Sequence, residues 1–278
     1  MKQLSYPAPP TTVRLIATDM DGTFLGADGT ASQTNCDAVL RAAELGIPTV
    51  FATGRPSRWL QPLDLVREAH PLVITSNGAA IIDLEDDNPV YVFPLDPVAT
   101  TEAVHDVRLA VPDASFAVEY LHTWGREDCF PLKGYQETAV IAPVEDLLAH
   151  GTPVKLLIRS KIPTGKLMAR VGPVVAGRLT VTFSMVSRSG FLEASSPGVS
   201  KASALQQILA DDGISPMDVA AFGDMPNDLA MLDLVGHPFI MGNAHSLLKK
   251  RGFPVCGHHD DSAFGATVLE LLGLAPQP

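Results

Sequence analysis

The stretch RLIATDMDGTFLG, residues 14–26, begins as an apolar run and ends with two acids one residue apart. An apolar run followed by turn-forming residues predicts a buried strand, and Asp-x-Asp-Gly is typical of a turn at its end. Asp19 and Asp21 are close enough to repel each other, so their position needs either a structural or a chemical reason. The stretch alone is compatible with a simple turn, and only other parts of the sequence can indicate whether the two acids form a chemical site.

Apolar runs and amphipathic segments alternate on both sides of residues 84–187. Ser32 is expected to cap the first helix and Gly46 to end it, while Pro56 is expected to begin the second. Such alternation predicts a Rossmann-like parallel sheet with helices on both faces. The expected strands are residues 13–18, 47–54, 71–79, 218–224 and 238–244, and the expected helices are 32–46, 56–70, 200–213 and 226–236.

The middle of the chain has longer strands of alternating polarity and two helix-like segments, 97–110 and 163–175. We therefore predict an α/β fold with an inserted α+β cap domain. The catalytic core would be formed by residues 1–83 and 188–278, and the cap by 84–187. One continuous α/β domain is the alternative.

Composition limits the function. The chain has 278 residues and a formal net charge of −11. This charge argues against broad binding to nucleic acid or to an anionic membrane, and a small anionic ligand would need a local positive site. The three cysteines are expected to be reduced thiols, and no run approaches the ~18 apolar residues of a membrane span. We expect a cytoplasmic protein, with monomer or homodimer left open.

Polar residues follow the predicted strands at one edge of the sheet, where ligands bind in open parallel sheets. They are Asp19, Asp21, Thr53, Gly54, Ser76, Asn77 and Asp224. The spacing after Asp19 does not fit a calcium loop, and Gly165-Lys166 does not fit a phosphate-binding P-loop. The pair His258-His259 has no patterned third ligand, so we interpret it as a loop.

Four motifs in fixed order resemble those of the haloacid dehalogenase-like (HAD) superfamily of phosphatases. They are DMDGT at 19–23, ATGR at 52–55, the lysine of GVSKASAL at 198–205, and GDMPND at 223–228. The sequences SNGA at 76–79 and GNA at 242–244, with the insert, narrow the resemblance to the Cof-type subgroup. The stretch DDSAFGA at 260–266 departs from the family's acidic-Asp-Gly-Val pattern, which leaves the conformation of this last loop undetermined.

The resemblance implies hydrolysis of a phosphate ester through an aspartyl-phosphate. Asp19 would be the nucleophile and Asp21 the general acid and base. The phosphoryl group would be held by Thr53, Gly54, Lys201 and Asn227. An Mg2+ cofactor would be bound by the Asp19 carboxylate, the Asp21 carbonyl and the Asp224 carboxylate, with help from Asp228.

The expected partner is a small phosphorylated metabolite, most plausibly a sugar phosphate, then flavin mononucleotide or pyridoxal phosphate. A phosphomutase is a second hypothesis, and a phospholigand-binding regulator without turnover is a third. Substrate contacts are expected from some of Arg55, Asn77, Tyr120, His122, Trp124 and Arg126. The alternation around the last four is equally typical of a solvated sheet face.

Overall fold

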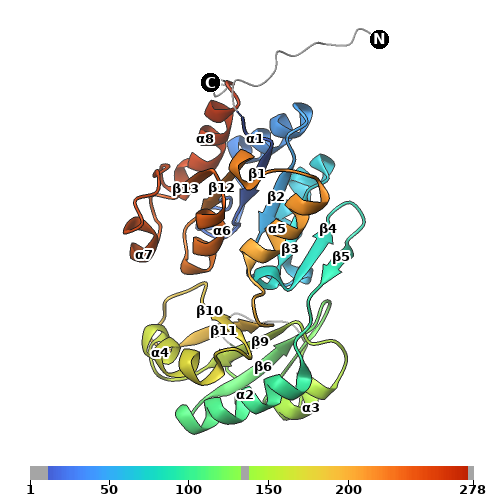
Figure 1. Ribbon diagram of the computed structural model, residues 1–278, viewed down its shortest axis with the longest axis vertical. Helices are drawn as coiled ribbons and strands as arrows, with labels where there is room; N and C mark the ends of the chain where they lie inside the picture. The colour runs from blue at the N-terminus through green and yellow to red at the C-terminus, as the bar shows by residue number, and fades with distance from the viewer. Residues whose placement is uncertain (1–11, 133–137, 275–278) are drawn as a thin grey trace.

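The computed structural model describes residues 12–132 and 138–274, and its strands form two sheets (Figure 1). The first sheet has seven strands in the order β13-β12-β1-β2-β3-β4-β5, and the second has six in the order β10-β11-β9-β6-β7-β8. The first sheet contains strands from both ends of the chain, whereas the second contains strands from its middle. Such an arrangement requires the chain to leave the first sheet and return to it.

Five strands of the first sheet are parallel, as the sequence predicted. They are β1 (Leu15–Thr18), β2 (Thr49–Ala52), β3 (Leu72–Thr75), β12 (Val219–Gly223) and β13 (His237–Ile240). The remaining strands, β4 (Ala80–Asp83) and β5 (Asn88–Val92), form an antiparallel hairpin at the edge. Only the short turn η3 (Ser76–Gly78) joins β3 to β4. So short a connection reverses the chain, because a parallel crossover needs a dozen or more residues.

Helices cover both faces of the first sheet, because side chains alternate along each strand. Ile16 packs with α1 (Gln33–Glu44) and α8 (Ala263–Leu271), in a cluster that contains Phe24, Phe51 and Phe264. Leu15 and Ala17 face the other way, toward α5 (Lys201–Asp211), α6 (Leu229–Leu234) and α7 (Ser246–Lys249). The predicted doubly covered α/β sheet is therefore confirmed.

The predicted helix ends are partly correct. The Ser32 side chain caps α1 by accepting a hydrogen bond from the backbone N–H of Asn35, and Gly46 follows the helix at a φ of +76°. The predicted helix at 56–70 is wrong in type, since it consists of the 3-10 segments η1 (Ser57–Trp59) and η2 (Gln61–Ala69). Pro62, near the start of η2, has no backbone N–H for a continuous α-helix. Further 3-10 turns are η4 (Pro216–Asp218), η5 (Pro226–Asp228) and η6 (His259–Asp261).

The second sheet is mostly antiparallel, and helices pack against an apolar cluster on it. This combination agrees with the predicted α+β insert. Its strands are β6 (Ser115–Glu119), β7 (Trp124–Arg126), β8 (Val140–Ile141), β9 (Lys155–Arg159), β10 (Thr180–Thr182) and β11 (Phe191–Ser195), and its helices are α2 (Pro97–Ala110), α3 (Val144–Ala149) and α4 (Thr164–Val175).

Two strands lie on the opposite side of the predicted domain boundaries. β5 belongs to the first sheet although residues 84–187 were assigned to the cap, and β11 belongs to the second although 188–278 were assigned to the core. The apolar pattern identified both strands, but strand pairing decides their sheet. We therefore propose that the chain crosses between the two halves after Val92 and again after Ser195. The division into two domains stays a prediction.

No helix in residues 12–132 and 138–274 is long and apolar enough to cross a membrane.

Candidate active site

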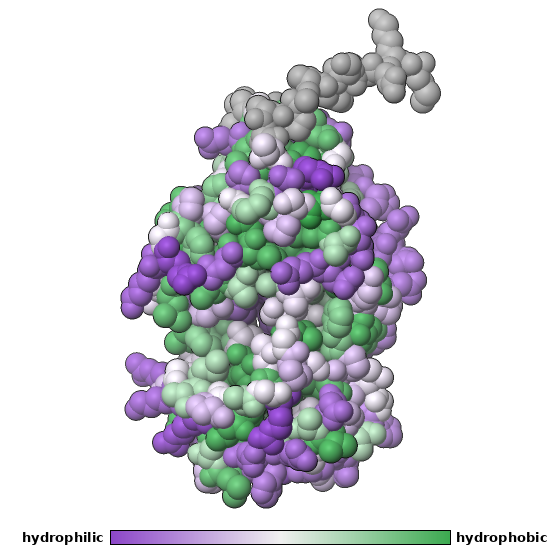
Figure 2. All heavy atoms as spheres, viewed as in Figure 1, coloured by the Kyte–Doolittle hydropathy of each residue, from purple (hydrophilic) through white to green (hydrophobic). Residues whose placement is uncertain are grey.

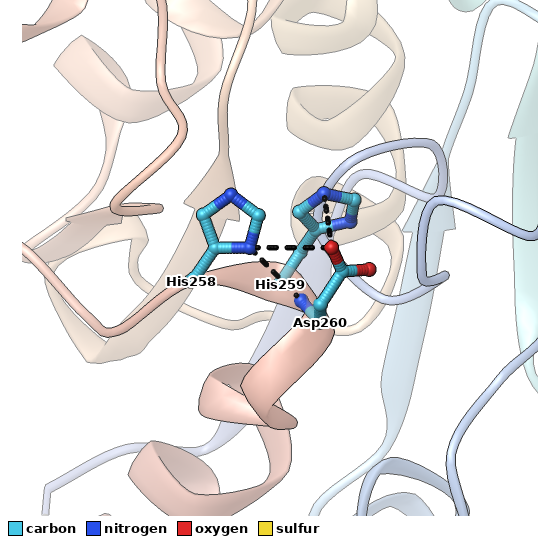
Figure 3. Close-up of side chains that lie close together, drawn as sticks. All are labelled: His258, His259 and Asp260. Atoms are coloured by element: carbon cyan, nitrogen blue, oxygen red, sulfur yellow. Dashed lines mark hydrogen bonds and ion pairs between the residues drawn. The ribbon is translucent and has the colours of Figure 1, made fainter.

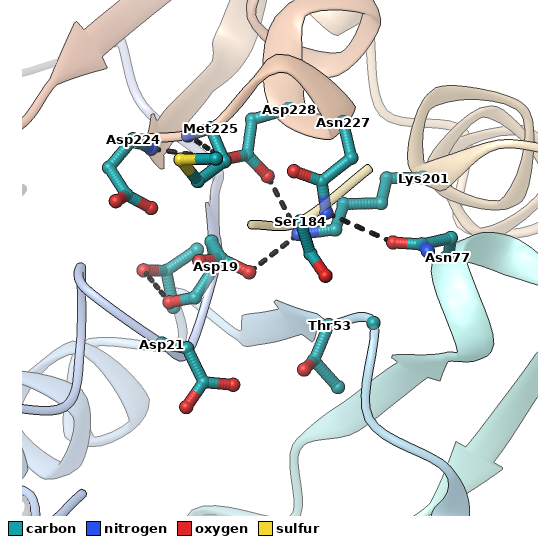
Figure 4. A network of polar contacts seen from close by, with 12 residues as sticks. Asp19, Asp21, Thr53, Asn77, Ser184, Lys201, Asp224, Met225, Asn227 and Asp228 are labelled. Carbon is teal, nitrogen blue, oxygen red and sulfur yellow. Dashed lines mark hydrogen bonds and ion pairs between the residues drawn. The ribbon is translucent and has the colours of Figure 1, made fainter. Parts of the chain in front are cut away.

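The carboxyl ends of β1, β2, β3 and β12 meet at one edge of the first sheet, and the predicted site residues gather there (Figure 4). Asp19 follows β1, and its backbone N–H donates to the carbonyl of Phe222 in β12, with N and O 3.0 Å apart. Asp224 follows β12, while Thr53 follows β2 and Asn77 follows β3. The parallel register therefore brings together residues as far apart in the sequence as Asp19 and Asp224.

A buried ammonium group joins the acids. The Nζ of Lys201 lies 2.5 Å from Oδ1 of Asp19 and 2.6 Å from Oδ1 of Asp228. The lysine side chain is 0% exposed. Burial lowers the pKa of Lys201, but the two carboxylates more than offset this effect and the net pKa is raised. The ammonium therefore stays charged and holds the two acids together.

The position of Lys201 depends on the turn after β3. Gly78 has a φ of +107°, and a Cβ there would lie only 2.2 Å from the carbonyl oxygen of Ser200. Ser200 caps α5 by accepting from the backbone N–H of Ser203, and Lys201 is the first residue of that helix. The absence of a side chain at Gly78 thus allows the start of α5 to approach the sheet edge.

Replacement of Gly78 by alanine is therefore expected to displace Ser200 and with it Lys201. We expect Gly78→Ala to cost about 2 kcal/mol or more of unfolding free energy, because a clash is added to backbone strain. The phosphate-ester hydrolysis that the sequence resemblance implies should fall at least about tenfold by the same displacement. The matched control is Gly177→Ala, which has a similar positive φ of +79° with no atom within 4 Å of its Cβ. Equal losses of stability and activity in the two variants would contradict this account.

Both carboxylate oxygens of Asp228 are already bonded. Oδ1 accepts from Lys201, and Oδ2 accepts from the backbone N–H groups of Asp224 at 3.0 Å and Met225 at 2.9 Å. Asp228 is 0% exposed. It therefore fixes the lysine and the segment that carries Asp224. Asn227 lies beside it, and its amide donates to Oδ1 of Asn77 at 3.0 Å.

Asp224 has a different environment. Its Oδ2 accepts from the Asn243 amide at 3.3 Å, but its buried Oδ1 has no hydrogen-bond partner among the described residues. Burial, followed by the charge of Asp228, raises the pKa of Asp224 to about 7. Burial also raises the pKa of Asp19 well above its ordinary value, although the Lys201 ammonium opposes the shift. For both carboxylates, the nearby positive charge of Lys201 is too small to offset the effect of burial on the pKa.

This arrangement fits a hard divalent cation. Carboxylate oxygens of Asp19, Asp224 and Asp228 lie within 4.8 Å of one another. The unpartnered Oδ1 of Asp224 provides a buried oxygen that is free to coordinate, and Mg2+ is typically bound by one or two carboxylates with other positions open. The residues present therefore fit the Mg2+ that the sequence predicted.

Asp21 and Arg55 form a second pair at the edge of this site. The Arg55 guanidinium contacts Asp21 through Nε to Oδ2 at 2.8 Å and through a terminal nitrogen to Oδ1 at 2.6 Å. The backbone N–H of Arg55 donates to the Thr53 hydroxyl at 3.0 Å. The Asp21 side chain is 57% exposed, unlike the buried Asp19. Arg55 therefore orients the acid that is accessible from the cavity.

A cavity of about 880 Å³ lies between the two sheets. Figure 2 shows the surface hollowed between the two halves of the molecule. Lys155 bridges them, because its Nζ donates to the Gly54 carbonyl at 2.7 Å and to Glu193 at 3.0 Å. The cavity is lined from the first half by Asp19, Asp21, Thr30, Gly54, Arg55, Trp59 and Asn227 among others, and from the second by Glu119, Lys155, Ser184, Met185, Phe191 and Glu193.

The structure does not bring the four predicted cap contacts to this cavity. The Tyr120 hydroxyl donates to the Leu147 carbonyl at 2.6 Å, and Trp124 is buried in an apolar cluster. Arg126 donates to the carbonyls of Glu127 and Asp128, both at 3.0 Å. His122 is exposed and does not line the cavity. The contacts of Tyr120, Trp124 and Arg126 thus lie within the second half of the molecule.

Lys155 and Glu193 line the cavity instead, and sequence reasoning missed both. A signal was present, because each charge interrupts an apolar strand, in VKLLIRS and FLEAS. Charged residues are rarely buried unless they are paired. Their pairing across β9 and β11 required the strand order, which the sequence did not give.

The last loop, undetermined from the sequence, forms η6 and leads into α8. Ser262 stands at its end with a φ of +58°. Asn243 connects this loop to the site, since its amide donates to the Gly22 carbonyl at 2.8 Å and its Oδ1 accepts from the His259 N–H at 3.3 Å. None of the residues 260–266 lines the cavity.

Comparison with known proteins agrees with these features. The model of the haloacid dehalogenase-like hydrolase family matches residues 16–266. A relative from Yersinia pseudotuberculosis, an HMP-PP phosphatase, is 27% identical over 261 residues, 85% of this chain and 86% of its own. A HAD-superfamily phosphatase structure from Bacteroides thetaiotaomicron has a TM-score of 0.82 at 22% identity, covering 98% of this chain and 99% of its own. The structure of a HAD subclass IIB sugar phosphatase has a TM-score of 0.77 at 18% identity. The match covers 94% of this chain and 99% of the sugar phosphatase chain.

The chain belongs to the haloacid dehalogenase-like hydrolase family. The chain is therefore a hydrolase by family, and the predicted resemblance, with its Cof-type subgroup, is confirmed.

Proposed function

We propose that the protein is a Mg2+-dependent phosphatase that hydrolyses a small phosphorylated metabolite through an aspartyl-phosphate on Asp19. The single observation that carries this proposal is the contact of the Lys201 ammonium with Asp19, beside the unpartnered Oδ1 of Asp224. It combines a carboxylate held at a strand end, a buried positive charge and an oxygen available to a cation. Phosphoryl transfer needs mainly such positioning and charge stabilisation.

Each residue has a proposed task. Asp19 attacks phosphorus, and Asp21, oriented by Arg55, first protonates the leaving alkoxide and then deprotonates the hydrolytic water. Lys201, with Thr53 and the backbone around Gly54, binds the phosphoryl oxygens. Asp19, the carbonyl of Asp21 and Asp224 would hold Mg2+, which supplies positive charge against a dianion. The contacts of Asp228 favour a supporting role behind these ligands.

Asp21 can reach the leaving oxygen and the hydrolytic water because it is exposed to the cavity while Asp19 is buried. To act first as an acid, it has to exchange one of its two Arg55 contacts for a proton when substrate binds. The bidentate contact with Arg55 fixes the direction of its carboxylate. Lys155 closes the opposite wall by linking Gly54 to the second half of the molecule. We infer that this half acts as the cap, which limits the access of water to the phosphorylated aspartate.

The cavity favours a polar, uncharged substrate group beyond the phosphate. Its volume of about 880 Å³ is suitable for a small metabolite. The charges on its far wall are already paired, Lys155 with Glu193 of the same wall and Glu119 with Arg58 of the first half. Such ion pairs can donate to and accept from the hydroxyl groups of a substrate, and they need no charge on the substrate to balance them. We therefore propose a sugar phosphate first, with flavin mononucleotide and pyridoxal phosphate as further candidates and HMP-PP added from the named relative.

Removal of the nucleophile tests the reaction. Asp19→Asn should abolish Mg2+-dependent phosphate release, with a loss of at least about 10³-fold, because an amide cannot form the phosphoenzyme. The measurement is inorganic phosphate released from a panel of these four substrate types, with and without Mg2+. Asp212→Asn, at an exposed acid, is the control and should keep full activity. Phosphate release that persists in Asp19→Asn would contradict the assignment.

The same assay separates the phosphomutase hypothesis. An isomeric sugar phosphate in place of inorganic phosphate would favour a mutase.

Removal of one buried carboxylate tests the metal site. Asp224→Asn should raise the melting temperature of the metal-free protein at pH 8, because a buried charge with an unpartnered oxygen is lost. A gain of about 1 kcal/mol corresponds to roughly 2–4 °C for a chain of this size. The same variant should lose the increase in melting temperature that Mg2+ gives the unmodified protein. Equal Mg2+ stabilisation of both proteins would show that the cation binds elsewhere.

A further inference from the structure

Three side chains outside the active-site cavity converge on one point: His258, His259 and Asp260 (Figure 3). Oδ2 of Asp260 lies 3.5 Å from Nδ1 of His258 and 3.7 Å from Nε2 of His259. One potential ligand atom from each of the three residues lies within 4.8 Å of the other two. The sequence interpretation as a loop rested on the lack of a patterned third ligand. The turn η6 supplies one, because it folds the next residue back between the two rings.

Hydrogen bonds with backbone groups fix the orientation of each of these three side chains. Nδ1 of His259 lies 2.9 Å from the Leu25 carbonyl oxygen. A carbonyl only accepts hydrogen bonds, so Nδ1 is the donor in this contact, and the other ring nitrogen, Nε2, faces Asp260. Nδ1 of His258 accepts from the backbone N–H of Asp260 at 3.3 Å, which orients this ring nitrogen toward Asp260. Oδ1 of Asp260 accepts from the Ala27 N–H at 2.8 Å, which leaves Oδ2 to face the imidazoles.

Two ring nitrogens and one carboxylate oxygen thus face one another, and this set of ligand atoms suits a metal cation between them. Metal-binding histidines typically donate their second ring nitrogen to a backbone carbonyl, as His259 does to Leu25. In a tetrahedral zinc site with bonds of about 2.0–2.1 Å, the ligand atoms are about 3.3–3.4 Å apart. The separations of 3.5 and 3.7 Å are close to this value.

We propose that His258, His259 and Asp260 form a binding site for a transition-metal dication of the Zn2+ class. Imidazole nitrogen suits such ions, whereas Mg2+ prefers oxygen ligands like those around Asp19 and Asp224. The His258 and Asp260 side chains are 46% and 48% exposed, so an ion can enter and keep water in its fourth position. The ion would replace the hydrogen bond that His258 accepts from the Asp260 backbone.

The site is connected to the loop after the catalytic acids. His259 holds the carbonyl of Leu25 and Asp260 holds the N–H of Ala27, while Thr30 of the same loop lines the active-site cavity. Asn243 adds a second connection, because it joins the His259 backbone to Oδ2 of Asp224 at 3.3 Å. A bound ion would therefore fix a loop that borders the substrate cavity.

Calorimetric titration with Zn2+ in the presence of excess Mg2+ tests the proposal. We expect one Zn2+ per chain, and affinity at least about tenfold lower in His258→Ala and in Asp260→Asn. Asp260→Asn keeps an oxygen that can accept from Ala27, so its fold should be preserved, and retained melting temperature checks this. His105→Ala, at an exposed histidine of α2, is the matched control and should bind Zn2+ like the unmodified protein.

A second variant tests whether Zn2+ binds instead to the carboxylates of Asp19, Asp224 and Asp228. Asp224→Asn should retain the Zn2+ affinity, because that residue belongs to the other site. Absence of stoichiometric Zn2+ binding to the unmodified protein would overturn the proposal. Equal affinity in Asp260→Asn and His105→Ala, or loss of binding in Asp224→Asn, would overturn it as well.

Discussion

The contact between the buried Lys201 ammonium and the carboxylates of Asp19 and Asp228 organises the first half of the molecule. Two buried acids next to a third would repel one another strongly without this charge. The ammonium comes from the start of α5, so this helix has to approach the ends of β1 and β12. Gly78 permits that approach, and Asp228 in turn fixes the segment after β12. The turn at Gly78, the start of α5 and the segment after β12 thus all position the contact of Lys201 with Asp19 and Asp228.

Positive charge in the site is nevertheless incomplete. Lys201 serves Asp19 and Asp228, while Asp224 keeps an unpartnered oxygen and a raised pKa. A protein selected only for stability would be expected to replace this residue. Its presence is understandable if a divalent cation completes the site, and a phosphate dianion then meets a pocket of nearly balanced charge. An acidic protein with a net charge of −11 can receive an anionic substrate in this way.

Much of the fold could be predicted from the sequence because strand signals and helix caps are local. The parallel strands, the Ser32 cap and the residues at the strand ends follow from patterns within about ten positions of each other. Sheet membership is not local, and the predicted boundaries therefore separate β5 and β11 from the sheets that they join. Because strand pairing could not be predicted, the residues that line the far wall of the cavity were not predicted either. Lys155 and Glu193 meet only through strand pairing, whereas Tyr120, Trp124 and Arg126 bond within the second sheet.

The two halves of the molecule have separate tasks in this account, chemistry at the strand ends and recognition on the opposite wall. The most direct test is to quench the reaction of the protein with a phosphorus-labelled substrate in acid and to map the label by mass spectrometry. The account predicts a phosphoryl group on the peptide that contains Asp19, formed only with Mg2+ and absent from Asp19→Asn. A label on any other residue, or turnover without a phosphoenzyme, would contradict it.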